Sequence, residues 1–223
     1  VKWYEKFKKS FEIINLCGNH DWSYLNQYGL VASGYRAYLN PDVKNSLESL
    51  DICIAYAYDN ILFTHAGITS NWAESTGIDT RSAYSCYNDL QLMFESNNNS
   101  LNSCSESRGG TDKFAGPLWC DQSDINSSSM QEGMPFNQVV GHTPMKHICN
   151  DVYKNGTSCT FIDTFSLKRN GDAFGDGSIL LLSIDDKERI GKGEIGCKET
   201  CGKSWETIAA ELKRSMLRMY DWF

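Results

Sequence analysis

The chain has 223 residues, of which 41% are hydrophobic and 12% aromatic, enough to build one α/β domain with a sizeable core. Its formal charge is −7, and no basic run interleaved with aromatic residues occurs, which argues against nucleic-acid binding. No window approaches the roughly 18 consecutive apolar residues of a membrane span, and the charged start does not resemble a signal peptide. We therefore expect a single domain over 1–223 with no membrane segment.

The first half of the chain reads as alternating helices and strands. Apolar residues at helical spacing, or in short unbroken runs bounded by turn residues, predict each element. In chain order these are the end of a helix over 1–9, a strand over 11–17, a turn over 18–21, a helix over 23–28, a helix from Pro41 toward Leu50, and a hairpin with strands over 51–58 and 61–65.

The second half contains longer polar stretches. A helix is expected over 80–95, where aromatic and apolar residues recur at helical spacing. The Asn- and Ser-rich stretch 96–110 is expected to be a polar, mobile insertion. Further predicted elements are a strand ending before His142, strands over 158–164 and 177–184, a charged connector over 185–203, and an amphipathic C-terminal helix over 204–222.

Nine cysteines are spread along the chain at irregular spacing. Several, such as Cys17, Cys53 and Cys159, lie in apolar, strand-like runs. This pattern favours free buried thiols in a reducing compartment, so we expect a cytoplasmic protein. Cys197 and Cys201 are spaced so that they could hold a metal or form a disulfide, but one pair alone is a weak signal and a coincidence within a loop is favoured.

Three of the four histidines share one local context. His20, His65 and His142 each follow an apolar strand-like run and stand close to a glycine, whereas His147 does not. Neutral imidazole is a common ligand of first-row transition metals, and the amide oxygen of a neighbouring Asn19 can complete a mixed N/O ligand set. Each histidine alone could be an ordinary loop residue, but the repeated placement favours a shared site.

The histidines stand in three short motifs that resemble a known family. The motifs are Gly18-Asn19-His20-Asp21, Thr64-His65-Ala66-Gly67 and Gly141-His142-Thr143-Pro144. In this order they are similar to the third, fourth and fifth motifs of the calcineurin-like metallophosphoesterases, most closely to the phosphoprotein-phosphatase branch, which includes serine/threonine phosphatases and diadenosine tetraphosphate hydrolases. Two further stretches resemble that branch, Gly116-Pro117-Leu118-Trp119 and Phe161-Ile162-Asp163-Thr164, and the similarity extends over residues 11–185.

The resemblance implies a fold and a division of roles. The fold is α/β, a two-sheet β sandwich flanked by helices, with the site on loops at strand ends. Asn19, His65 and His142 would bind the second of two divalent metal ions (Mn, Fe or Zn), while His20 would stay unligated and act as general acid. In such a site a hydroxide between the metals attacks the phosphorus in line, and the general acid protonates the leaving group.

One departure from the family is large. Its first two motifs, Asp-x-His and Gly-Asp-x-x-Asp-Arg-Gly, are nowhere in this sequence, although they supply the first metal's ligands and a phosphate-binding arginine. Because the chain starts without Met, we expect them in N-terminal β-α units that precede it; the alternative is a catalytically inactive derivative. With this sequence alone, at most one weakly bound metal ion is expected, and the chain by itself could be inactive for lack of the upstream metal ligands.

Four further residues are weaker candidates. Asp21 is expected to hold the turn or adjacent backbone groups rather than a metal. Arg108 could bind phosphate, although a solvated loop arginine is at least as well supported. Trp119 could line the cleft, with a place in the core favoured, and Asp163 is expected to support the loop that carries His142.

The favoured function is hydrolysis of a phosphate ester, with phosphorylated proteins ahead of nucleotides as substrates. A serine/threonine phosphoprotein phosphatase is placed first, and a dinucleoside polyphosphate hydrolase is the alternative within the same enzyme class. An inactive interaction module that keeps the fold is a third possibility, and a non-catalytic metal protein that uses His20, His65 and His142 together is a fourth. The sequence pattern does not specify an oligomeric state.

Overall fold

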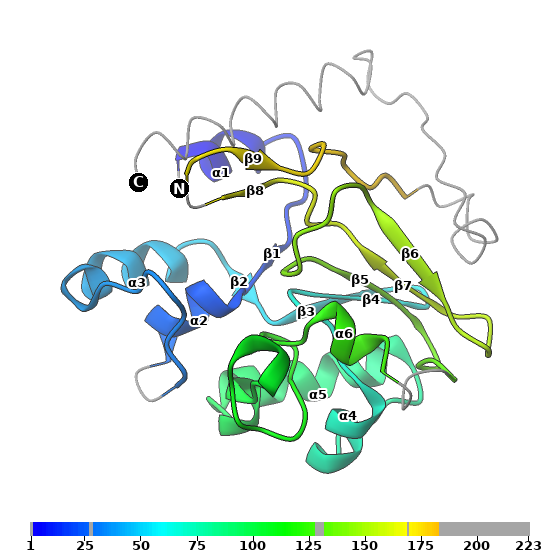
Figure 1. Cartoon of the computed structure of the whole chain (residues 1–223). Coiled ribbons are helices and arrows are strands. Elements are labelled where there is room, and N and C mark those ends of the chain that lie inside the picture. The colour runs from blue at the N-terminus through cyan, green and yellow to red at the C-terminus, as the bar shows by residue number, and fades with distance from the viewer. Residues whose placement is uncertain (1, 27–28, 128–131, 169, 183–223) are drawn as a thin grey trace.

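The computed structural model describes residues 2–26, 29–127, 132–168 and 170–182, and its architecture is mixed α/β (Figure 1). Five strands form one sheet in the spatial order β3-β4-β5-β7-β6. They are β3 (Ala55–Tyr58), β4 (Ile61–Thr64), β5 (Asn137–Val140), β7 (Ser158–Phe161) and β6 (Cys149–Val152). The three central strands run parallel, and each outer strand is antiparallel to its neighbour. The predicted α/β class is confirmed.

The predicted hairpin is present, but its first strand is divided. Asp59 adopts a left-handed conformation (φ 53°) in the turn between β3 and β4, as turn-forming aspartates do. Alternation in β3 places Ala55 and Ala57 in the core and leaves Tyr58 exposed. The two residues before this strand form β2 (Ile52–Cys53), which leaves the sheet and pairs in parallel with β1 (Asn15–Leu16).

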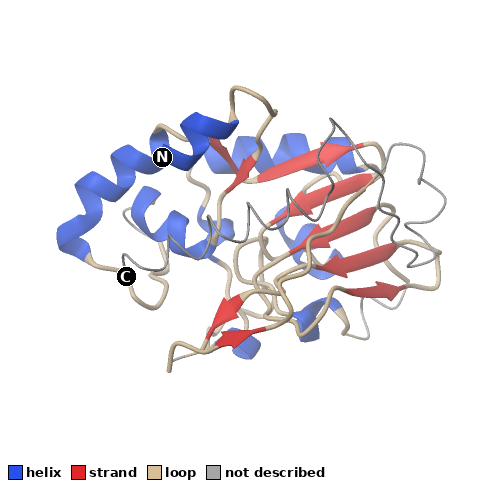
Figure 2. Ribbon diagram, turned by 90° about the horizontal axis from the view of Figure 1, so that it is seen from above, coloured by secondary structure: helices blue, strands red, loops and turns tan. Residues whose placement is uncertain are grey.

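The helices between residues 70 and 125 lie on one face of the five-stranded sheet, whereas the α-helices before residue 50 lie away from that face (Figures 1 and 2). Serine and threonine side chains begin two of them: Thr69 caps α4 and Ser82 caps α5. The α-helices are α1 (Lys2–Phe7), α2 (Asn19–Leu25), α3 (Asn40–Glu48), α4 (Ser70–Thr76), α5 (Ala83–Glu95) and α6 (Gln122–Ile125). Three short 3₁₀ helices are η1 (Ala37–Leu39), η2 (Asn99–Asn102) and η3 (Glu106–Arg108).

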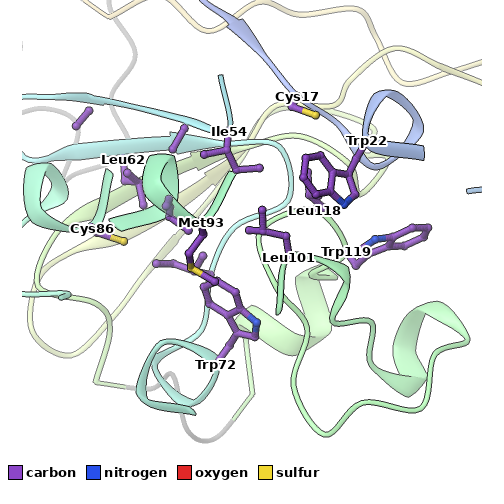
Figure 3. Packing of buried hydrophobic residues seen from close by; sticks show 14 of the residues in the cluster. Cys17, Trp22, Ile54, Leu62, Trp72, Cys86, Met93, Leu101, Leu118 and Trp119 are labelled. Carbon is purple, nitrogen blue, oxygen red and sulfur yellow. The ribbon is translucent and has the colours of Figure 1, made fainter. Parts of the chain in front are cut away.

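The main core lies between this sheet face and the helices (Figure 3). It buries the side chains of Trp22, Leu62, Trp72 and Leu90 from four different elements. Leu101 also enters this core, with no exposed surface. The stretch 96–110 was expected to be a polar, mobile insertion, but its residue Leu101 packs into the core of the domain.

Two predicted elements differ in the structure. The expected turn over 18–21 is the first turn of α2, because Gly18 is already the N-cap residue of that helix. Residues 177–182 form no strand in the described part of the chain, since no neighbouring strand pairs with them; the hairpin β8 (Ser166–Leu167) and β9 (Ala173–Phe174) precedes them instead. The predicted helix over 204–222 lies outside the described residues.

Within the residues that the structure describes, no helix combines the length and apolar character that crossing a bilayer requires. The seven described cysteines are all free thiols, and those with the deepest burial include Cys17, Cys120 and Cys159. Burial raises the pKa of these three thiols, which keeps them protonated and unreactive. The expectation of free thiols therefore holds for the described cysteines, whereas Cys197 and Cys201 lie outside the described ranges.

Candidate functional site

The residues of two predicted motifs meet at one edge of the sheet. Strands β4 and β5 are parallel neighbours, with Thr64 opposite Val140, and His65 and His142 follow these two residues. A backbone hydrogen bond from Gly141 N–H to the carbonyl of His65 (2.9 Å) extends the pairing beyond the strands. Because both strands end at the same edge, the two imidazoles are brought together, as expected for ligand sites in parallel sheets.

The remaining motif, Gly18-Asn19-His20-Asp21, also lies at this edge of the sheet. Strand β1 leads into α2, whose first residue, Asn19, is buried. Its Oδ1 lies 3.1 Å from Nε2 of His65, and the same Nε2 lies 2.9 Å from Nδ1 of His142. The two imidazole rings stand edge-on, with centroids 4.7 Å apart. The structure thus brings together the three side chains predicted as metal ligands.

Two backbone features make this approach possible. A Cβ on Gly18 would lie 3.0 Å from both Cε1 and Nδ1 of His65, so any other residue there would push the imidazole from its present place. His142 adopts a left-handed conformation (φ 65°), which is uncommon for a residue with a side chain. Strained conformations of this kind persist where the surrounding structure holds them, and functional sites are a frequent place for them.

The local electrostatics keep both imidazoles neutral. Burial, with further contributions from the charges of His20 and Arg108, lowers the pKa of His65 to about 4. Burial, His65 and Arg108 together lower the pKa of His142 to about 3. At neutral pH each ring therefore has an unprotonated nitrogen available, which is the form that binds metals.

The donor atoms fit a divalent transition metal. Two ligands about 2.1 Å from a metal and at roughly a right angle to each other stand about 3.0 Å apart, which matches the 2.9 and 3.1 Å separations around His65 Nε2. Two imidazoles and an amide oxygen form a mixed N/O set suited to such ions. In the described ranges, no three side chains drawn from His, Cys, Asp and Glu are grouped to hold a metal ion. The third donor atom beside His65 and His142 is an asparagine oxygen, which such a grouping does not include.

His20 and Asp21 differ from these three residues. His20 is exposed in the first turn of α2, and its charge lowers the pKa of both His65 and His142, which places it near them. Asp21 accepts a hydrogen bond from Gly18 N–H through Oδ2 (2.9 Å), and burial raises its pKa. Asp21 therefore holds the start of the helix, as expected, and His20 faces solvent beside the donor set.

Arg108 belongs to the site rather than to a solvated loop. Its Nε lies 2.8 Å from Oδ2 of Asp121 in an ion pair. Its Nη2 donates to Oγ1 of Thr143 (2.8 Å) and to the backbone carbonyl of His142 (3.5 Å). Sequence reasoning missed the roles of Asp121 and Thr143. The available signal was their position: Thr143 lies within a quoted motif, and Asp121 lies two residues after another one.

Trp119 and Asp163 flank the histidines in different ways. Trp119 is buried, as favoured, and its ring also lies edge-on to that of His142, with centroids 6.3 Å apart. Asp163 accepts a hydrogen bond from Met145 N–H through its backbone carbonyl (2.7 Å), while its carboxylate accepts from Ser166 Oγ (3.0 Å). Asp163 thus supports the loop after His142 through its backbone.

No family model, curated protein or solved structure matches this chain. The chemistry of the site must therefore be inferred from its own side chains. They offer a neutral N/O donor set, a fixed guanidinium beside it, and an exposed imidazole at the neighbouring helix start. That combination suits a phosphorylated ligand, because metal ions and arginine both bind phosphate oxygens.

Proposed function

We propose that the protein is a metal-dependent phosphoesterase of the calcineurin-like type that acts on phosphoserine or phosphothreonine in proteins. The observation that carries this proposal is that Asn19 Oδ1 and His142 Nδ1 both lie close to His65 Nε2, at 3.1 and 2.9 Å. The order and chemistry of the three motifs that supply these atoms resemble that family, and the observed distances suit ligands of a single ion.

Asn19, His65 and His142 would hold the metal ion. When bound, a divalent ion supplies positive charge that neutralises phosphate oxygens and lowers the pKa of a nearby water molecule. The protein contributes the geometry: burial keeps both imidazoles unprotonated, and the parallel strands β4 and β5 fix their separation. The first-metal motifs of the family are absent from this sequence, so the chain's own residues provide one metal site.

His20 would supply the proton for the leaving group. It is exposed beside the donor set, where the oxygen of a departing serine or threonine can reach it. General acid catalysis of this kind contributes roughly 10²–10⁴-fold to the rate. No hydrogen bond joins His20 to His65 or His142 in the described part of the chain, which disfavours a mononuclear site built from the three histidines.

A phosphomonoester suits the charge of the site better than a polyphosphate. Among the described lysines and arginines, Arg108 alone contributes to the lowered pKa of both His65 and His142. A single guanidinium can bind the oxygens of one phosphoryl group in a bidentate manner. A dinucleoside polyphosphate would present several phosphates and favours more positive charge along the cleft.

The proposal extends to the fold. We propose that the pair β1–β2 is part of a second sheet, which would complete a two-sheet sandwich with the five-stranded sheet. Supporting this, β2 leaves the larger sheet at Ile54 and pairs in parallel with β1, which leads directly into the Asn19 motif. The apolar residues 177–182, which form no strand in the described structure, would join the same sheet.

The test uses the full-length native protein, with whatever residues precede Val1 in it, and compares the wild type with His20→Ala and His147→Ala in Mn²⁺, using p-nitrophenyl phosphate and a phosphoserine peptide. We expect wild-type turnover, a loss of about 10²-fold or more in kcat for His20→Ala, and no change for His147→Ala, whose exposed ring pairs with Asp176. Bound Mn²⁺, measured by its electron paramagnetic resonance signal, should persist in His20→Ala. Absence of turnover by the wild-type protein with both substrates would refute the proposed function.

A further inference from the structure

Arg108 lies in a segment with little regular structure, yet three other groups contact its side chain. It follows Glu106 and Ser107 in the one-turn helix η3. Its guanidinium contacts Asp121 Oδ2 at 2.8 Å, Thr143 Oγ1 at 2.8 Å and the His142 carbonyl at 3.5 Å. An arginine side chain has many rotamers in solution, so these contacts decide where its charge lies.

The two carboxylate oxygens of Asp121 have separate tasks. Oδ1 accepts from Ser123 N–H and from Ser123 Oγ, both at 2.9 Å, and so caps α6. Oδ2 faces Nε of Arg108. The side chains of Arg108 and Asp121 are only 24% and 21% exposed, so solvent screens this pair less than a surface ion pair. Oδ1 of Asp121 therefore stabilises the start of α6, and Oδ2 faces the guanidinium of Arg108.

The backbone around Arg108 is anchored separately. Ser105 Oγ donates to both oxygens of Asp124 (3.0 Å each), and Ser107 Oγ donates to Asp124 Oδ2 (2.7 Å). Asp124 therefore fastens η3 to the start of α6, whereas Asp121 fastens the guanidinium itself. The described contacts of Arg108 use Nε and Nη2 and leave Nη1 for a ligand.

We propose that Asp121 is a positioning residue that aims the guanidinium of Arg108 at a phosphate bound beside His142, with Thr143 as its second support. This inference rests on the proposed function, in which a phosphorylated substrate occupies the site. Asp121 itself contacts no substrate. It acts by holding Nε so that the free edge of the guanidinium keeps one orientation, which preserves binding geometry that an unrestrained arginine would lose.

Asp121→Asn is the sharpest variant. Asparagine caps helices as well as aspartate does, so its amide oxygen can keep the Oδ1 contacts to Ser123 and the fold should persist. Its amide nitrogen replaces Oδ2 and removes the negative charge that faces Nε of Arg108. Asp79→Asn is the matched control, because Asp79 pairs with the exposed Arg81 in another part of the chain.

We expect Asp121→Asn to raise KM for p-nitrophenyl phosphate about tenfold with a smaller change in kcat, and to raise the Kd of inorganic phosphate similarly. Arg108→Ala should lower kcat/KM about 100-fold, and the double variant should be no worse than Arg108→Ala alone, since Asp121 acts through Arg108. Thr143→Val should lower kcat/KM more than Thr143→Ser does, because serine keeps the hydroxyl group. Asp79→Asn should match the wild-type protein.

Phosphate binding, measured by calorimetry in the presence of Mn²⁺, separates this inference from the proposed function. Wild-type turnover with unchanged KM and phosphate Kd in Asp121→Asn would overturn the role of Asp121 and leave the function standing. Phosphate binding that depends on Arg108 and Asp121, without turnover of any ester, would support the role of Asp121 and overturn the function. If the wild-type protein neither binds phosphate nor turns over an ester, both are overturned. Additive losses in the double variant would also contradict the inference.

Discussion

Two kinds of histidine stand a few residues apart in this protein. His142 is partly buried against His65, at the end of a parallel strand, in a left-handed conformation that the surrounding structure holds. His147, five positions later, is 76% exposed at its side chain and pairs with Asp176 (2.9 Å). The two histidines differ in environment and not in residue type: burial and a neighbouring imidazole keep His142 neutral, whereas solvent and a carboxylate surround His147.

Metal binding should show the largest difference between the partly buried histidines and the exposed His147. His65→Ala and Asn19→Ala should weaken Mn²⁺ binding by about 100-fold or more, because each removes a ligand atom, while His147→Ala should bind as the wild-type protein does. Titration calorimetry or the Mn²⁺ resonance signal measures this. If His65→Ala binds Mn²⁺ as tightly as the wild-type protein does, Asn19, His65 and His142 do not form a metal site.

Acid should act on the buried pair before it acts on the rest of the domain. The pKa of His65 is about 4 in the folded protein and 6.5 as a free side chain, so the unfolded state binds more protons between these values. Stability should therefore be fully present above pH 6.5 and fall by up to about 3 kcal/mol as the pH drops toward 4. Urea unfolding at pH 7, 5.5 and 4.5 measures this loss.

A matched variant makes the pH test specific. His65→Gln keeps a neutral polar side chain but no longer titrates, so its stability should depend less on pH over the same window. An unchanged pH dependence in His65→Gln would mean that other groups cause the loss. His142 shares the same environment and its lowered pKa acts in the same direction.

A side chain at Gly18 should disturb the site less than the loss of a donor atom does. In Gly18→Ala the added Cβ would lie 3.0 Å from the His65 ring, and relief of that contact would move the ring away from Asn19 and His142. We expect a loss of about 1–3 kcal/mol in the free energy of unfolding, together with weaker Mn²⁺ binding. Gly141→Ala is the control, because its Cβ would meet only the His65 carbonyl, at an ordinary 3.5 Å; equal effects of the two changes would contradict this account.

The smallest effect is expected at the exposed histidine. Asp176→Asn removes the partner of His147 on the surface, where screening by solvent leaves little net stabilisation in an ion pair. The melting temperature at pH 7 should stay within the error of a calorimetric scan. A clear drop in this temperature would show that the loop around His147 depends on that pair, and the contrast with His142 would weaken.

Local sequence patterns predicted much of the frame that carries the site. The hairpin β3–β4 follows from alternating residues around a turn at Asp59, and α5 follows from helical spacing behind a serine cap. These are short-range properties, so the chain specifies them without distant partners. The run 177–182 shows the limit: an apolar run becomes a strand only when another strand pairs with it, and the described structure offers none.

By itself the sequence determined which residue types stand at the ends of the apolar runs, and so indicated Asn19, His20, His65 and His142 as candidates. Tertiary structure alone decided that Nε2 of His65 faces both Asn19 and His142, because strand register and a glycine at position 18 set that approach. It alone also placed Arg108 at the site, through contacts with Asp121 and Thr143 that lie 13 and 35 positions away. The physical reason is that helical and strand periodicity act over a few residues, whereas a binding site depends on side chains that only packing brings together.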